Sequence, residues 1–318
     1  MQLSEYCRPF ISANKPWPKF PLPIEASITW WQNWIIRTPP INYFSALRNE
    51  LPQLWIMPRE GASSSEVYKR LVLKGEVPNP SDRDSALHLN DPGGFVVSLV
   101  DHPCGTFPVI DINDQIDFLN VVRCLAYKCE LESIQESVHA QAVSGLIHWG
   151  LIKMINKNER SQLIILHNAP YSSLQESVVP GRPTWNQWLL LSRRWRLEHE
   201  LTHLATKLLA GEMRLNLFDE LIADTLGMLF AIDTFSADLF IKGLGINVDG
   251  NLNEGGRCHT YIKQLEQKDS QAAIKFVVDR AYELEELLST GLLRSERLPL
   301  LKYLIRQQLD KTFLVASC

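Results

Sequence analysis

Apolar residues recur at helical spacing through most of the chain after residue 112. Apolar positions three and four residues apart, with few internal breakers, predict helices over six segments: 113–131, 133–157, 184–210, 216–235, 270–290 and 297–311. The run QLIILHNAP at 162–170 is continuously apolar at its centre, which predicts a strand between the helices. The glycine-containing stretch 243–256 predicts a loop.

The first 112 residues follow a different pattern. Residues 1–40 are rich in proline and tryptophan, and proline fixes the backbone and lacks an N–H donor, so we expect an extended arm pinned down by its tryptophans. Between 41 and 112 short apolar runs, QLWIMP and GGFVVSLV among them, alternate with turn signals and predict a few strands. The sequence therefore predicts an α+β, mainly helical protein with a small α/β region over 1–112 and a helical domain over 113–318.

Composition limits the classes of partner. The 318 residues are 45% hydrophobic and 21% charged, which is typical of a globular protein, and the net charge of −4 offers no electrostatic case for nucleic acid. No apolar run is long enough for a membrane span, and the amino terminus lacks an apolar stretch behind a basic start. The six cysteines are scattered and predict reduced thiols. We therefore expect a cytoplasmic protein that binds neither membrane nor nucleic acid.

The segment RLEHELTH carries a pattern associated with zinc. His199 and His203 are four residues apart, so on a helix both imidazoles lie on one face and reach one ion, while Glu200 reaches a water in the open position. Thr184 and Gln187 form a capping box before this helix, and Gly211 suits its end. Two histidines on a helix can also be core residues with satisfied nitrogens, and this alternative stays open.

The next helix offers the remaining ligand. Asn216 is a good N-cap, and Glu220 and Asp224 follow on one face of the predicted helix. Glu220 lies far enough after His203 for an antiparallel return and can be the third protein ligand of Zn²⁺. Asp224 can accept the outer N–H of a ligating histidine. The alternative is an acidic solvent-facing pair, but apolar residues surround both carboxylates in the sequence.

These two segments together resemble the gluzincin peptidases. HELTH followed by Glu220-Leu-Ile-Ala-Asp224-Thr-Leu-Gly227 is similar to the compact gluzincins, over residues 162–235. The resemblance implies a zincin-like core with an active-site helix and a glutamate helix. It also implies that Asn168 and Ala169, which follow the strand QLIILH, hold the backbone of a substrate as an edge strand does in thermolysin-like enzymes. A metzincin is excluded, because Thr206 and Leu209 stand where glycine and histidine would be needed.

A gluzincin also needs a donor for the oxyanion that forms during hydrolysis. The candidates are His259 and Tyr261 in GRCHTYIKQL, with Arg257 beside them, and Tyr171 near the proposed substrate strand. A histidine after a loop is more often a surface or capping residue. Three arginines at 193, 194 and 196 are expected to form a solvated helix face or to pair with two nearby glutamates, Glu198 and Glu212.

The sequence thus predicts a zinc-dependent metallopeptidase. Zn²⁺ would be bound by His199, His203 and Glu220, with Glu200 as the general base, and the substrate would be a specific protein or peptide. One alternative is a catalytically inactive binding or regulatory protein that keeps the same fold, with zinc or merely the helix pair as a structural element. Another is a zinc hydrolase that acts on a non-peptide amide.

Overall fold

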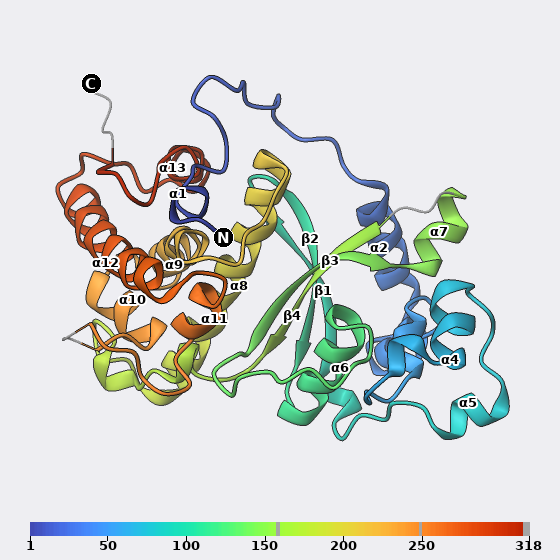
Figure 1. Ribbon diagram of the computed structural model, residues 1–318. Coiled ribbons are helices and arrows are strands. Elements are labelled where there is room, and N and C mark those ends of the chain that lie inside the picture. Colours follow the sequence, from blue (N-terminus) through green and yellow to red (C-terminus); the bar gives the residue numbers. More distant parts are fainter. Residues whose placement is uncertain (157–159, 248–249, 314–318) are drawn as a thin grey trace. The chain divides into compact units, whose positions relative to one another are not determined.

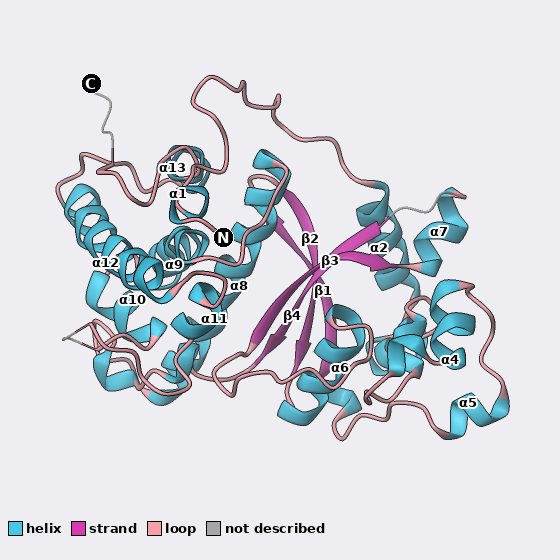
Figure 2. Cartoon of the chain, viewed as in Figure 1, coloured by secondary structure: helices cyan, strands magenta, loops and turns pink. Residues whose placement is uncertain are grey.

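The chain forms two compact units. The computed structural model describes residues 1–156, 160–247 and 250–313 (Figure 1). One unit, here the helical unit, consists of Met1–Leu22 and Ala169–Cys318, and the other, the sheet unit, consists of Pro23–Asn168. Helices and one four-stranded sheet make the described part of the chain α+β, as predicted (Figure 2). The composition shift at residue 112 marks the end of a strand inside the sheet unit and not the boundary between the two units.

The sheet has the strand order β1-β2-β4-β3. Strands β1 and β2 form an antiparallel hairpin, β2 pairs with β4 in parallel, and β4 pairs with β3 antiparallel. The strand predicted from QLIILH is therefore confirmed as β4. It is an inner strand, however, and not an edge strand, because both of its sides are hydrogen-bonded to neighbours. The bounds are Phe95–His102 for β1, Gly105–Ile112 for β2, Ala140–Ile147 for β3 and Arg160–His167 for β4.

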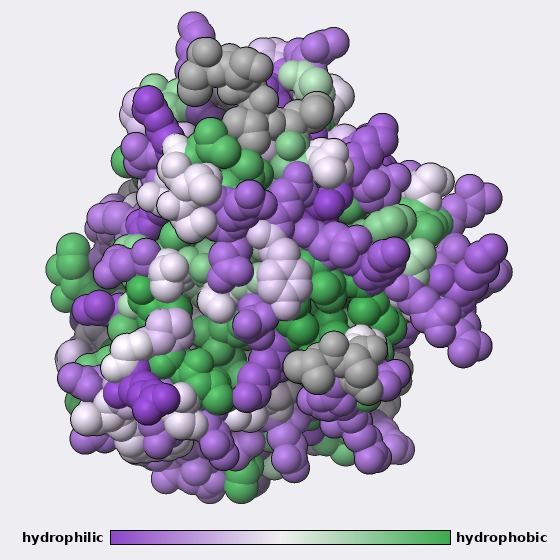
Figure 3. Space-filling view, turned by 90° about the vertical axis from the view of Figure 1, so that its left-hand side faces the viewer, coloured by the Kyte–Doolittle hydropathy of each residue, from purple (hydrophilic) through white to green (hydrophobic). Residues whose placement is uncertain are grey.

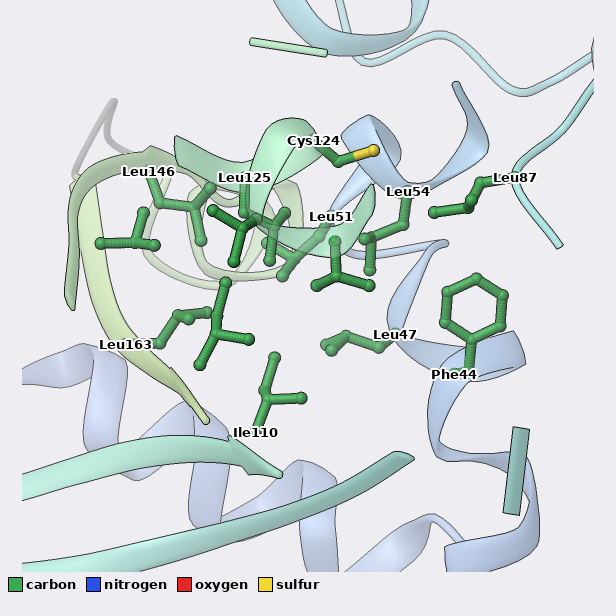
Figure 4. Close-up of a cluster of buried hydrophobic side chains, with 14 of the residues drawn as sticks. Phe44, Leu47, Leu51, Leu54, Leu87, Ile110, Cys124, Leu125, Leu146 and Leu163 are labelled. Atoms are coloured by element: carbon green, nitrogen blue, oxygen red, sulfur yellow. The ribbon is translucent and has the colours of Figure 1, made fainter. Parts of the chain in front are cut away.

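One face of this sheet holds a hydrophobic core (Figure 4). Alternate strand residues such as Val97, Ile110 and Leu163 point into the core, where they meet apolar side chains of α2 and α6. Helix α6 begins after Asp114, whose side chain accepts a hydrogen bond from the N–H of Asp117. The helices of the sheet unit are α2 Ala26–Arg37, α3 Tyr43–Leu47, α4 Glu66–Tyr68, α5 Pro80–Asp84, α6 Gln115–Ala126 and α7 Trp149–Ile155.

Three predictions for the sheet unit were wrong. Residues 26–37 form helix α2 and not an extended arm, because the prolines stop before Ala26 and the tryptophans Trp30, Trp31 and Trp34 share one buried helix face. The run QLWIMP, at 53–58, forms no strand, and its first three residues belong to a short 3₁₀ helix, Pro52–Trp55.

The third error is the helix predicted over 133–157. Residues Ala140–Ile147 form strand β3, because pairing with β4 gives their backbone groups partners. Gly145, with φ of 78°, allows a register shift in the strand there. Only Trp149–Ile155 of this segment is helical among the residues that the structure describes.

The helical unit contains four of the six predicted helices, whereas the predicted helix 113–131 lies in the sheet unit as α6. The two long segments around the zinc pattern form α8 and α9, and 270–290 forms α12. The predicted loop 243–256 begins within the end of α10, and its residues 248–249 lie outside the described part. The helices are α1 Leu3–Tyr6, α8 Trp185–Ala210, α9 Leu217–Ile232, α10 Ala237–Leu244, α11 Cys258–Ile262, α12 Gln267–Ser289 and α13 Arg297–Leu304.

The first residues of the chain belong to the helical unit. The side chain of Tyr6 is fully buried, and its hydroxyl accepts a hydrogen bond from the N–H of Leu217 and donates one to the carbonyl of Tyr261. Arg8 makes a bidentate ion pair with Glu212, in the connection between α8 and α9. The amino-terminal segment thus packs against the start of α9 and is hydrogen-bonded to it.

The outer helices of the helical unit are amphipathic. Helix α12 buries Ala273, Val277 and Ala281, spaced four residues apart, and exposes its other side. On the face shown in Figure 3, hydrophilic side chains interrupt the apolar surface. No helix among the described residues is long and apolar enough to cross a lipid bilayer.

Candidate metal centre

Helices α8 and α9 form the frame of the site. As predicted, α8 begins after Thr184, whose N–H donates to the side chain of Gln187, and it ends at Gly211 in the left-handed conformation with φ of 91°. Helix α9 begins after Asn216, whose side chain accepts from the N–H of Asp219. Six residues, 211–216, join the helices, so α9 returns against α8 and the two pack together.

A glycine allows the two helices to approach closely. A Cβ atom on Gly227 of α9 would lie 2.4 Å from Cδ1 of Trp195 on α8 and 3.0 Å from its backbone oxygen. Contacts this short mean that any other residue here would have to displace Trp195. The last position of the pattern Glu220-x-x-x-Asp224-x-x-Gly227 therefore has a packing role, and it sets how near the Glu220 carboxylate lies to α8.

The three predicted metal ligands come together. Candidate ligand atoms of His199, His203 and Glu220 all lie within 4.8 Å of one another, and all three side chains are buried. The two Nε2 atoms are 3.0 Å apart. The carboxylate oxygens of Glu220 lie 3.5 Å from each of them, Oε2 from His199 and Oε1 from His203. Two nitrogens bound to one tetrahedral zinc ion are separated by about 3.3 Å, so the observed spacing fits such an ion.

The outer nitrogens of both histidines face carboxylates. Nδ1 of His199 lies 2.9 Å from Oδ1 of Asp224, and Nδ1 of His203 lies 3.2 Å from Oδ2 of Asp219. These contacts favour a proton on each Nδ1, which turns the lone pairs of the two Nε2 atoms toward each other. Two lone pairs at 3.0 Å repel unless a proton or a cation lies between them. Two imidazole nitrogens and one carboxylate are the donor set that binds zinc with a position left for water.

The charges of the surrounding groups favour a cation. Burial by itself lowers the pKa of His203, but Asp219 and Glu220 outweigh burial and hold this pKa well above its usual value. Burial raises the pKa of Glu220, whereas His199, His203 and Arg257 together bring it below the usual value. Glu220 therefore keeps its negative charge, and positive charge is stabilised between the ligand atoms.

Asp224 is held by several donors. Its Oδ1 accepts hydrogen bonds from Tyr171 and, at 2.9 Å, from Nε1 of Trp195, and its Oδ2 lies 2.9 Å from Nη2 of Arg257. Burial raises the pKa of Asp224, but Arg257 and His199 bring it well below its usual value. Asp224 is thus a fixed anion behind His199, the role predicted for it. The sequence also suggested Tyr171 as an oxyanion donor, whereas its hydroxyl is engaged here with Asp224.

Two residues were missed or underrated from the sequence. Asp219 stands behind His203 as Asp224 stands behind His199, and its position immediately before Glu220 was the available signal. Arg257 was noted only as a neighbour of His259. It is buried, and it contacts Glu220, Asp224 and Tyr171.

The two downstream donor candidates differ in their environments. The side chain of His259 is exposed, and its Nε2 lies 3.1 Å from the carbonyl oxygen of Asn253 in the loop before α11, so the structure does not bring it to the buried ligands. Tyr261 lies beside Glu220, where burial, followed by the charge of that carboxylate, raises the pKa of the tyrosine well above its usual value. Of the two, Tyr261 is the one that adjoins the site.

The arginines of α8 were misjudged in part. Arg196 does not belong to a solvated face: it is buried, and its Nη2 donates to the carbonyls of Ala169 at 2.8 Å and Pro170 at 3.2 Å. Glu198 pairs with Arg297, whose Nη2 lies 2.8 Å from its Oε2. Arg196 lies one turn before Glu200, and burial lowers the pKa of Arg196 to about 10, although the charge of Glu200 partly opposes this effect. Glu200 is buried next to His199 on the helix, as the pattern requires.

Arg196 fixes the segment that carries Tyr171. Ser172 and Ser173 follow with φ of 49° and 57°, a left-handed conformation that is uncommon for serine. Such backbone conformations persist where surrounding contacts hold them, often at functional sites. Ala169 is buried and tied to Arg196, and Asn168 follows the inner strand β4, so their proposed contact with a substrate backbone loses its edge-strand argument and stays a prediction.

Comparison with known proteins gives one match. A protein-family model described as "Family of unknown function (DUF7005)" matches residues 1–163 and 157–299. No curated protein and no solved structure shows a significant match to the chain. What the site can do must therefore be inferred from its own geometry.

Proposed function

The chain belongs to the DUF7005 family, and we propose from the geometry of its site that it is a zinc-dependent metallopeptidase with a zincin-like core. The observation that carries this proposal is the convergence of two histidine Nε2 atoms and one glutamate carboxylate, with Glu200 on the same helix as the histidines. Both histidines have carboxylates behind them, as metal-ligating histidines usually do.

His199, His203 and Glu220 would hold the ion. A bound zinc ion would supply a Lewis acid that polarises a carbonyl group and lowers the pKa of a coordinated water to about 7. Glu200 takes the proton of the attacking water and later transfers it to the leaving amine. Asp224 and Asp219 keep the two imidazoles oriented, and Tyr261 is the candidate donor for the oxyanion.

The substrate class follows from the same reasoning. Addition of water to a polarised carbonyl with a carboxylate as base suits a peptide bond. We propose limited processing of a specific protein or peptide, because a peptidase in the cytoplasm, the compartment expected from the sequence, must spare its neighbours. Asn168 and Ala169 remain the proposed contacts with the substrate backbone.

One observation favours a second candidate function. Arg257 lies 3.2 Å from Oε2 of Glu220 and 2.9 Å from Oδ2 of Asp224, so both acidic groups have a cationic partner within the chain itself. A binding or regulatory protein without catalysis could use such a cluster to hold α8 and α9 together. This candidate predicts a folded protein that neither retains zinc nor cleaves peptides.

The proposal is tested with Glu200→Gln. The purified protein is incubated with a random peptide library and with unfolded casein, and new termini are read by mass spectrometry. We expect cleavage by the wild type, a fall of about 10²–10⁴-fold in the variant, and unchanged zinc content. Glu198→Gln is the matched control, since Glu198 is the other buried acid of this turn and pairs with Arg297. Equal cleavage by wild type and Glu200→Gln would refute the assignment of the base.

A further inference from the structure

The side chain of Arg257 contacts both Glu220, a candidate metal ligand, and Asp224, the carboxylate behind His199. It is buried and directly precedes α11. Its Nη2 lies 3.2 Å from Oε2 of Glu220 and 2.9 Å from Oδ2 of Asp224, while its Nη1 donates to the hydroxyl oxygens of Tyr171 at 3.0 Å and Ser172 at 2.7 Å. A single guanidinium thus contacts a candidate ligand and the carboxylate behind another ligand.

Close backbone contacts before Arg257 hold this residue in position. Gly245, with φ of 78°, packs directly on Gly256: a Cβ on Gly245 would lie 2.7 Å from Cα of Gly256. A Cβ on Gly256 would lie 3.1 Å from the carbonyl oxygen of Asn253. The amide of Asn253 in turn donates to the carbonyl of Gly245 at 2.8 Å. These contacts fix the backbone immediately before Arg257. Glycine is needed at 245 and 256 because a side chain at either position would prevent this close packing.

From these contacts, and on the premise of the metal site proposed above, we propose that Arg257 is a positioning residue that engages Oε2 of Glu220 and so reserves Oε1 for the metal. A carboxylate with one oxygen bound to a guanidinium presents the other oxygen to a cation. Both oxygens lie 3.5 Å from a histidine Nε2, Oε1 from His203 and Oε2 from His199, but only Oε2 is contacted by Arg257.

The shape of the side chain matters as much as its charge. Arg257 uses both terminal nitrogens, one toward the two carboxylates and one toward the two hydroxyls. The planar guanidinium can donate to the carboxylates and to the hydroxyls at the same time, whereas the ammonium of lysine is a point charge on a flexible side chain. A buried guanidinium needs such partners, because an unpaired charge away from water is costly. Arg257→Lys therefore keeps the charge but loses the geometry.

The experiment compares wild type, Arg257→Gln and Arg257→Lys. Zinc affinity is measured by chelator competition, and the visible spectrum of the Co²⁺-substituted protein reports the coordination of the ion independently of any activity. Arg70→Gln is the matched control, since Arg70 also makes an arginine–carboxylate pair, with Asp82, but in the sheet unit. Circular dichroism checks that each variant is folded.

We expect both Arg257 variants to bind zinc about 10–100-fold more weakly than wild type, with an altered Co²⁺ band intensity, while Arg70→Gln keeps both properties. If Arg257→Gln does not fold, Arg257→Lys gives the answer. Wild-type zinc affinity and spectrum in the folded variant, with only a raised KM, would overturn the proposal and place Arg257 on the substrate instead. A wild type that binds no zinc would instead refute the proposed function itself.

Discussion

Gly227 of α9 lies against the indole of Trp195 on α8, so closely that an added Cβ would meet Cδ1 at 2.4 Å. The same indole donates from Nε1 to Oδ1 of Asp224 at 2.9 Å, and Oδ1 of Asp224 lies 2.9 Å from Nδ1 of His199. The packing of the two helices and the orientation of a metal ligand therefore depend on one side chain. Any change that displaces Trp195 reaches the metal centre.

Gly227→Ala tests this link. The added methyl group must push Trp195 aside, which we expect to lower the free energy of unfolding by about 1–3 kcal/mol and to weaken zinc binding. Urea denaturation and chelator competition measure the two effects. Gly243→Ala is the control: this glycine is also helical, in α10, but its Cβ would meet its nearest neighbours at an ordinary 3.8 Å. There alanine should be neutral or more stable by about 0.5–1 kcal/mol. A Gly227→Ala protein with wild-type stability and zinc affinity would contradict the packing role.

Asp219→Asn tests the second histidine. Asp219 lies 3.2 Å from Nδ1 of His203 and accepts the N–H of Arg214, so its loss removes the charge that orients this imidazole. We expect zinc affinity to fall by about 10–100-fold without loss of the fold. The control is Asp238→Asn, because Asp238 is bonded to Tyr282 away from the ligands. Equal zinc affinity for the two variants would show that Asp219 does not support His203.

His148 is expected to make the stability of the protein depend on pH. Its ring packs at 4.2 Å from that of Trp30 and 5.4 Å from that of Trp31, and neither ring nitrogen has a hydrogen-bond partner among the described residues. Burial lowers the pKa of His148 to about 3. The unfolded chain therefore binds the proton first as the pH falls, so stability is lost between about pH 6.5 and pH 3.

The substitution His148→Leu isolates the contribution of this histidine to the pH dependence of stability. Between pH 7 and pH 5 the wild type should lose about 2 kcal/mol more unfolding free energy than His148→Leu does. Urea titrations at both pH values give the comparison. The same pH dependence in both proteins would mean that His148 is not buried in its neutral form.

The parts of the fold that the sequence predicted are those fixed by local signals. The capping residues Thr184 and Asn216 and the αL residue Gly211 act within a few residues of their helix ends, so α8 and α9 could be located closely. The spacing of His199 and His203 on one helix face is equally local. These features carried the prediction of the ligands.

The parts that failed depend on distant partners. Strand β3 obtains its hydrogen bonds from β4, and α2 is stabilised by burial of Trp30, Trp31 and Trp34, which outweighs the proline signal before it. The role of Arg257 could not be predicted, because its contact with Glu220 is formed only in the folded chain. In the sequence, no local pattern showed that Arg257, and not His259, would lie at the site. Arg196 was taken as solvated because the carbonyls that it binds lie outside its own helix.

Zinc content is the most direct test of the central claim that His199, His203 and Glu220 bind one divalent ion. Wild type and His203→Ala are purified in parallel without added metal, and their metals are determined by mass spectrometry alongside circular dichroism. We predict about one zinc per wild-type chain and almost none in the folded variant, because two remaining ligands bind zinc weakly. A folded wild type without zinc, or a variant that retains as much as wild type, would contradict the account.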